Sequence, residues 1–180
     1  LYGWCNKNFK KDGSPYNVYS DGLKVFTTVD SRMQRYAEEA VYQHVARYLQ
    51  PAFSKEISSK PSSPYSDKLT PKQIKVILNR SITQSERYQT MKAAGYSEQE
   101  IHDAFRKKID MTVFTYHGDV DTLMSPLDSI RYYKTFLRSG FMSMDPKTGA
   151  VKAYVGGLDY THFMYDMVSL GRRQVGSTIK

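Results

Sequence analysis

Apolar residues between positions 31 and 49 recur at intervals of three and four, so that they would line one side of a helix. This period predicts a single amphipathic helix over residues 31–49. Asp30 and Ser31 precede it as candidate N-caps, and Gln34 stands at capping-box spacing from Ser31. Pro51 is expected to end the helix, because proline lacks the N–H that a helix interior requires.

Alternation of apolar and polar side chains replaces the helical period in two other places. Residues 23–29 alternate in this way and are rich in β-branched residues, which predicts a strand. Residues 141–155 hold two apolar runs around the sequence Asp-Pro-Lys-Thr-Gly at 145–149, which predicts a β-hairpin. We expect the strand at 23–29 to pair with this hairpin. Helices at 31–49 and 126–138 would then pack on one face of the sheet.

The stretch between these elements, about 51–110, is predicted to be a helical insert. Its first part is rich in Ser, Pro and Lys and indicates a loop. Thr70, followed by a proline, signals the start of a short helix. Gly95 separates two further helices, and the second begins with a capping box at Ser97 and Glu100. Three positions of that helix are expected to be buried: Ile101, Phe105 and Ile109.

The predicted fold class is therefore α+β, a small antiparallel sheet with helices packed on it plus a helical insert, and an incomplete domain. Hydrophobic residues make up 40% of the 180 positions, which excludes global disorder. No run approaches the roughly 18 apolar residues of a membrane span. The single cysteine, Cys5, excludes an internal disulfide and is interpreted as an incidental thiol.

The formal charge of +8 would attract polyanions. The basic residues are spread along the chain, however, and no aromatic–basic signature of RNA binding is visible. Nucleic acid is therefore not an expected partner.

Histidines form two weak candidates for a metal or catalytic site. His44 lies on the apolar side of the first predicted helix, where a place at the edge of the core is favoured over a role as ligand or base. His117, Asp119 and Asp121 surround a predicted strand end near Gly118, but their spacing fits no metal-ligand signature. A polar turn is the favoured interpretation, and we expect neither a metal nor a cofactor.

The last residues carry the strongest candidate chemistry. Ser177 and Lys180 are three positions apart, so on a helix they share one face. A neutral lysine amine could take the proton of the serine hydroxyl and make it a nucleophile. Gly176 would let the backbone approach a substrate closely. On spacing alone the alternative is favoured, in which Ser177 only caps a helix and Lys180 faces solvent.

The sequence around this pair reverses that preference. The blocks SMDPKTGAVKAYVGG and RRQVGSTIK resemble the opening of the transpeptidase domain of class A penicillin-binding proteins. The upstream block GLKVFTTVDSRMQRYAEEAV is similar to the strand–helix unit of the same family. The matching residues of the first two blocks are Asp145, Pro146, Thr148, Gly149, Val151, Ala153, Val155, Gly156, Gly157, Arg173, Gln174, Gly176, Ser177 and Lys180.

The resemblance implies a fragment of a peptidoglycan synthase. Residues 1–22 would be an irregular lead-in after a missing glycosyltransferase domain. Residues 23–140 would be an interdomain linker that contains the helical insert, and residues 141–180 the start of a transpeptidase domain truncated at Ser-x-x-Lys. The parent protein would lie in the bacterial inner membrane, on its periplasmic side, with its anchor outside this chain.

The resemblance also implies the chemistry of the parent protein. Ser177 would be the acyl-ester nucleophile of a DD-transpeptidase and Lys180 its general base, while the parent would also polymerise glycan strands. Its implied partners are lipid II, peptidoglycan stem peptides, β-lactams and envelope activator proteins.

The fragment alone is expected to be inactive. The family's Ser-x-Asn motif is missing, and Lys147-Thr148-Gly149 precedes the serine as part of the predicted hairpin. The alternative to an enzyme segment is a non-catalytic interaction module that binds envelope partners or wall polymer.

Overall fold

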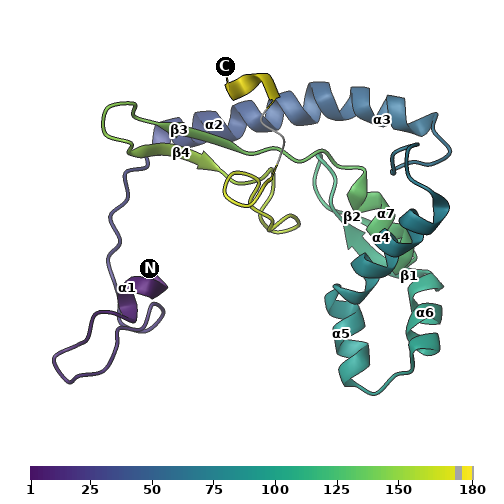
Figure 1. The fold of residues 1–180 in the computed structure, drawn as a ribbon, viewed down its shortest axis with the longest axis horizontal. Helices are drawn as coiled ribbons and strands as arrows, with labels where there is room; N and C mark the ends of the chain where they lie inside the picture. Colours follow the sequence, from purple (N-terminus) through teal and green to yellow (C-terminus); the bar gives the residue numbers. More distant parts are fainter. Residues whose placement is uncertain (173–175, 180) are drawn as a thin grey trace.

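The computed structural model describes residues 1–172 and 176–179. A long helical rod crosses the molecule, a β-hairpin lies along its first part, and a group of shorter helices hangs from its far end (Figure 1). The α-helices are α1 (Tyr2–Cys5), α2 (Ser31–Gln43), α3 (Gln50–Ser58), α4 (Pro71–Thr83), α5 (Glu86–Ala93), α6 (Glu98–Arg106) and α7 (Pro126–Lys134). The strands are β1 (Ile109–Val113), β2 (Val120–Met124), β3 (Phe141–Met144) and β4 (Val151–Val155).

Two separate two-stranded antiparallel sheets, β1–β2 and β3–β4, accompany the helices in the described part of the chain. This arrangement confirms the α+β class. Residues 1–22, with α1, form a small unit at the N-terminal end that stands apart from the rod (Figure 1). Cys5 is buried within that unit.

The rod is longer than the sequence predicts. Asp30 caps α2, accepting hydrogen bonds from the backbone N–H groups of Arg32 and Met33. The prediction that Pro51 ends the helix is wrong, because the chain continues through a π-helical turn, η1 (His44–Leu49), directly into α3. In a straight α-helix the proline ring would clash with the carbonyl four residues back. The π turn just before Pro51 changes this bonding pattern and lets the helix pass through.

The predicted strand at 23–29 is also wrong. The segment is extended but has no strand ladder, and it reaches β4 only near its end. The hydroxyl of Thr28 donates to the carbonyl of Val151, and the N–H of Asp30 donates to the carbonyl of Lys152. Phe26 is 93% exposed, so the alternating pattern has no sheet face to bury against.

The predicted hairpin is confirmed as β3–β4. In its turn, the carboxylate of Asp145 accepts hydrogen bonds from the N–H groups of Lys147 and Thr148, and these bonds lower the pKa of Asp145. Gly149 follows with φ +71°, a left-handed conformation that favours glycine. The Lys-Thr-Gly sequence at this point therefore builds a turn. Helix α2 packs on β4 through a small apolar core of Ala37, Val41, Ala153 and Val155.

Helices α4 to α7 form a helical unit with its own core. That core is centred on Ile82, Ile101 and Phe105, as predicted for the last two. The capping boxes at Thr70 and Ser97 are both present. The core is completed by the partly buried residues Tyr88, Met91, Leu127 and Ile130.

Three boundaries around this unit differ from prediction. The Ser-, Pro- and Lys-rich stretch predicted as a loop from residue 54 is helical up to Ser58. Ile109 opens strand β1 and is only partly buried; β1 ends at Val113 and pairs with β2, whereas the sequence predicts one strand that ends near Gly118. Helix α7 ends at Lys134.

Gln50 joins the rod to the end of α7. Its side chain is buried, donates from Nε2 to the carbonyl of Thr135 at 2.9 Å, and accepts at Oε1 from the N–H of Leu137 at 2.9 Å. The buried amide is thus paired at both ends, as a buried polar group requires. This contact sets where the chain turns from the helical unit back toward β3.

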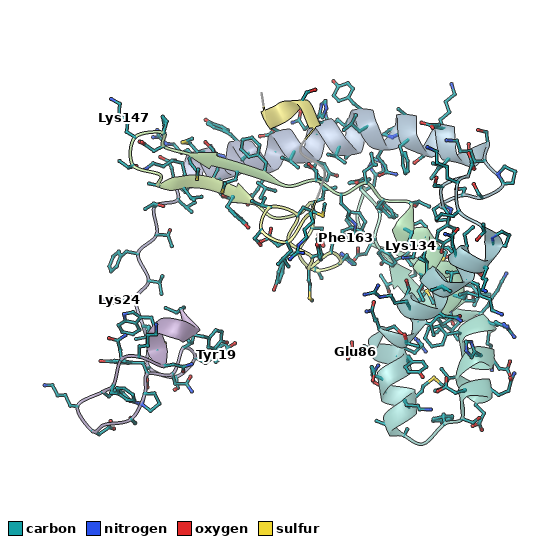
Figure 2. All side chains as sticks on the ribbon, viewed as in Figure 1. Tyr19, Lys24, Glu86, Lys134, Lys147 and Phe163 are labelled. Carbon is teal, nitrogen blue, oxygen red and sulfur yellow. The ribbon has the colours of Figure 1, made fainter. Side chains whose placement is uncertain are left out.

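An aromatic cluster fills the junction between the helical unit and the segment after β4. Phe114 follows β1, Phe136 follows α7, and Phe163 comes from the segment 158–172. Phe163 is buried, and Figure 2 shows it between the hairpin and the helical unit. The guanidinium of Arg138 lies 3.6 Å from the centre of its ring, a cation–π contact.

Candidate functional site

Ser177 lies in a short 3-10 turn, η2 (Gly176–Ile179), and is exposed. Gly176 immediately before it has φ +56°, the left-handed region that side-chain-bearing residues avoid. Lys180, the predicted base, and Arg173 and Gln174 of the same motif lie outside the described residues. The structure therefore places the predicted nucleophile on an accessible turn, and its pairing with Lys180 remains a prediction.

The segment 158–172, which leads toward Ser177, is held by the carboxylate of Asp166. This carboxylate accepts hydrogen bonds from the hydroxyls of Ser169 at 2.6 Å and Tyr154 at 2.5 Å, and from the N–H groups of Val168 and Ser169. These bonds, that of the Ser169 hydroxyl above all, lower the pKa of Asp166 to about 2. Because Tyr154 belongs to β4, the same carboxylate ties the segment to the hairpin.

Close backbone packing tightens the segment further. The N–H of Met167 donates to the carbonyl of Gly156 at 2.7 Å. A Cβ placed on Gly171 would lie 2.4 Å from the carbonyl oxygen of Met167, closer than any real contact. Glycine is therefore required at position 171, five residues before Gly176.

His162 fixes the other side of the segment. Its Nδ1 lies 2.9 Å from Oδ1 of Asp159, and its Nε2 lies 3.3 Å from Oδ1 of Asp119 in the turn between β1 and β2. The ring packs on Phe114 with centroids 5.2 Å apart. The imidazole thus connects the segment that leads to Ser177 with the hairpin β1–β2.

The structure places the two weak histidine candidates, the group around His117 and the lone His44, in different surroundings. Asp119 contacts His162, Asp121 accepts a hydrogen bond from the hydroxyl of Thr112, and His117 is exposed. Within residues 1–172 and 176–179, no group of three potential ligands has the arrangement of a metal site. His44 is exposed, so the expectation of a place at the core edge is wrong.

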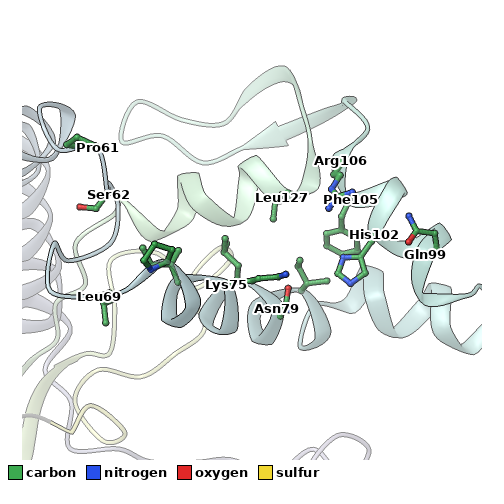
Figure 3. Close-up of a pocket in the computed structure, with 14 residues that line it drawn as sticks. Pro61, Ser62, Leu69, Lys75, Asn79, Gln99, His102, Phe105, Arg106 and Leu127 are labelled. Carbon is green, nitrogen blue, oxygen red and sulfur yellow. The ribbon is translucent and has the colours of Figure 1, made fainter.

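A second feature lies in the helical unit. A groove of about 810 Å³ runs between α4, α6 and the loop at 61–69. Figure 3 shows Lys75 on one side and His102 and Arg106 on the other, with Leu127 of α7 at the base. The side chains that line the groove include no carboxylate, so it combines an apolar floor with basic edges.

Sequence reasoning missed the residues that join the parts. Gln34 was assigned to a capping box, but its side chain pairs with the backbone of Tyr154 in β4. Nothing local in the sequence indicates the contact between Asp119 and His162, since the two residues meet only through the fold. The glutamine in the strand–helix block was visible as part of the resemblance, although its role was not.

The family model and the relatives that match this chain all carry the description penicillin-binding protein. Residues 60–137 match the family model described as the penicillin-binding protein middle domain. Penicillin-binding protein 1A of Neisseria flavescens is 27% identical over 199 aligned residues, covering 96% of this chain and 24% of that protein. Penicillin-binding protein 1A of Neisseria meningitidis serogroup A is 26% identical, covering 91% of this chain and 23% of its own length.

A shorter match has higher identity. Penicillin-binding protein 2D of Bacillus subtilis is 46% identical over 44 residues, covering 24% of this chain and 6% of that protein. No solved structure matches the chain significantly. None of the described helices is long and apolar enough to cross a membrane.

The part of the chain that aligns with the penicillin-binding protein 1A relatives includes the helical unit, the rod and the hairpin. The chain spans about a quarter of the length of the penicillin-binding protein 1A relatives. The family model over residues 60–137 and the similarity over most of the chain to penicillin-binding protein 1A together support a relationship to the class A penicillin-binding proteins.

Proposed function

We propose that the parent protein is a peptidoglycan synthase of the inner membrane, acting on the periplasmic side, that cross-links stem peptides through Ser177. The same parent would polymerise glycan strands from lipid II in a separate glycosyltransferase domain. This chain supplies the nucleophile segment of the transpeptidase and the helical unit that precedes it. The observation that carries the proposal is the exposed Ser177 in a turn begun by Gly176, within the motif Gly-Ser-x-x-Lys.

The chemistry follows from these residue types. Lys180 Nζ takes the proton of the Ser177 hydroxyl, and Oγ attacks the carbonyl carbon of the penultimate D-alanine of a stem peptide. The tetrahedral intermediate collapses to an acyl-ester, and the terminal D-alanine leaves as the amine after taking up a proton. The amino group of a second stem peptide then attacks the ester, forms the cross-link and releases the Ser177 hydroxyl. A β-lactam would acylate the same oxygen, with its ring nitrogen taking the proton and no group leaving.

Labelling of the full-length parent protein with a fluorescent penicillin tests this function. The wild type should be labelled covalently, and Ser177→Ala should abolish the label. Ser20→Ala, at an exposed serine of the N-terminal unit, is the matched control and should label as the wild type does. Retained labelling of Ser177→Ala would refute the proposal. The isolated 180-residue chain should not be labelled, because a single helical turn lacks the neighbours that hold a lysine in register.

A second function, protein docking, is favoured by the groove of the helical unit. The occupant we propose is a short amphipathic helix of a partner protein, with an apolar face and acidic flanks. The groove volume of about 810 Å³ is in the range of binding pockets, and its apolar floor suits a helix face. Lys75 and Arg106 stand on opposite edges, where acidic flanks would meet them, although Asp103 lies 3.8 Å from Arg106.

A pair of designed peptides tests the docking function. One carries leucines at i, i+3, i+4 and i+7 flanked by glutamates, and the other replaces the glutamates with lysines. In NMR spectra of the 180-residue chain, the acidic peptide should shift the signals of Leu78 and Leu127, and the basic peptide should leave them unchanged. The double variant Lys75→Glu/Arg106→Glu should reverse this preference. Equal effects of both peptides, or none, would refute docking.

A further inference from the structure

We propose that His162 is a positioning residue that clamps the nucleophile segment to the β1–β2 turn, and that the clamp is tightest when its imidazole is protonated. The inference rests on the proposed function of Ser177. It adds that the unit at 60–137 influences acylation through this contact. The clamp would make penicillin acylation depend on Asp119, which lies on a different hairpin from the rest of the candidate site.

The geometry presents one imidazole to two carboxylates. Nδ1 of His162 lies 2.9 Å from Asp159, whose carboxylate also accepts the backbone N–H of His162 at 2.8 Å. Nε2 lies 3.3 Å from Asp119. The first contact is local and closes the loop around residue 160. The second reaches across to the β1–β2 turn, so it is the contact that joins two units.

Protonation decides how many of these contacts are hydrogen bonds. An imidazolium has two N–H donors, whereas neutral imidazole has one donor and one lone pair. With both nitrogens facing carboxylates, the protonated ring satisfies both, and the neutral ring turns a lone pair toward one of them.

The groups around His162 come from three elements. Asp159 belongs to its own segment, Asp119 to the β1–β2 turn, and Arg138, which follows α7, lies over the neighbouring Phe163. Phe114 covers one face of the ring and leaves the side chain 20% exposed. The two carboxylates are therefore the charged groups within hydrogen-bond reach, and the cation of Arg138 lies against the adjacent phenylalanine.

The clamp is connected to the nucleophile along the chain. From His162 the segment passes the carboxylate of Asp166, which fixes it to β4, and then the tight approach at Gly171. Ser177 follows six residues later. Within the described residues, the segment is therefore held at His162, Asp166 and Gly171 on its way toward Ser177.

The test compares acylation rates of the full-length protein by a fluorescent penicillin between pH 5.5 and 8.5. Asp119→Asn removes the charge that faces Nε2 and keeps the shape of the side chain. Asp121→Asn, on the same hairpin, is the matched control because Asp121 accepts its hydrogen bond from Thr112. The ratio of wild-type to variant rate constants cancels pH effects that are common to both proteins.

For Asp119→Asn the wild type should acylate about threefold faster at the acidic end of this range, in keeping with a half-exposed ion pair. The ratio should fall toward one at the alkaline end, and for Asp121→Asn it should stay near one throughout. A ratio for Asp119→Asn that is flat with pH, or equal to that of the control, would overturn the inference. Labelling that survives Ser177→Ala would instead overturn the proposed function, so the two failures are distinguishable.

Discussion

The side-chain amide of Gln34 pairs with the backbone of Tyr154 as a neighbouring strand would. Nε2 of Gln34 donates to the carbonyl of Tyr154 at 2.9 Å, and the N–H of Tyr154 donates to Oε1 at 2.7 Å. The segment 23–29 fails to form a strand beside β4, and this amide supplies two of the hydrogen bonds that such a strand would have made. One side chain of α2 thus fixes the hairpin on the rod.

Replacing Gln34 should loosen the hairpin. Gln34→Ala leaves the N–H and carbonyl of Tyr154 without these partners, which should lower the free energy of unfolding by about 1–3 kcal/mol. Urea denaturation of the 180-residue chain, followed by circular dichroism, measures the loss. Gln43→Ala is the matched control, because Gln43 bonds only one helical turn back to Glu39. Equal stability of the two variants would contradict the role given to Gln34.

Gly171 should tolerate no side chain. In Gly171→Ala the new Cβ would meet the carbonyl oxygen of Met167 at 2.4 Å, so the segment must shift. We expect a loss of about 1–3 kcal/mol in local stability, as for other overpacked sites. Faster hydrogen exchange of the Leu170 amide, which bonds to Asp166, would report it. Gly3→Ala should have no such effect, since its Cβ would meet no atom within 4 Å.

The segment near Asp166 should become less stable as the pH falls. Because the pKa of Asp166 is lowered from its ordinary 3.8 to about 2, its hydrogen bonds stabilise the segment fully above pH 4 and are lost as the pH falls through 2. The amide chemical shifts of Val168 and Ser169 should therefore titrate with a midpoint near pH 2.

Ser169→Ala provides the comparison for that titration. Removing the hydroxyl that contributes most to the lowered pKa should move the midpoint up toward the ordinary value. A wild-type midpoint already near 3.8 would show that the hydroxyl bonds do not persist in solution.

Replacing Phe163 should lower the free energy of unfolding far more than replacing an exposed phenylalanine. Phe163→Ala empties the centre of the aromatic junction and should lower the free energy of unfolding by about 3–5 kcal/mol. Phe26→Ala should change it by less than about 0.5 kcal/mol, because Phe26 is 93% exposed. Thermal unfolding of the two variants beside the wild type gives the comparison. Similar melting temperatures would mean that the junction is not packed as described.

Structural features that depend on nearby residues were predicted well from the sequence. The N-cap at Thr70, the capping box at Ser97 and the turn from Asp145 to Gly149 depend on residues within five positions of each other. The expectation that Pro51 ends the rod failed, because the π turn that admits it also depends on packing along the rod.

Contacts between distant residues account for the other failures. The segment 23–29 is rich in residues that favour strands, but it does not form a strand ladder with β4. Its β-propensity is not sufficient, because that propensity depends on the surrounding packing. Within the candidate site, Ser177 could be found from a short motif. The clamp from His162 to Asp119 could not, because the two residues are brought together by the aromatic junction between separate units.

The π turn η1 also sets the angle between Gln34 and Gln50 around the rod. Gln34 and Gln50 are 16 positions apart, and in an unbroken α-helix they would point about 160° away from each other. One extra residue in the π turn rotates the second glutamine back by about 100°, toward the side that carries the first. Gln50 then binds the chain at Thr135 and Leu137, just before β3, while Gln34 binds Tyr154 of the partner strand β4. Removing a single residue between 44 and 49 would therefore rotate Gln50, and with it the end of α7 that it binds, by about 100° around the rod.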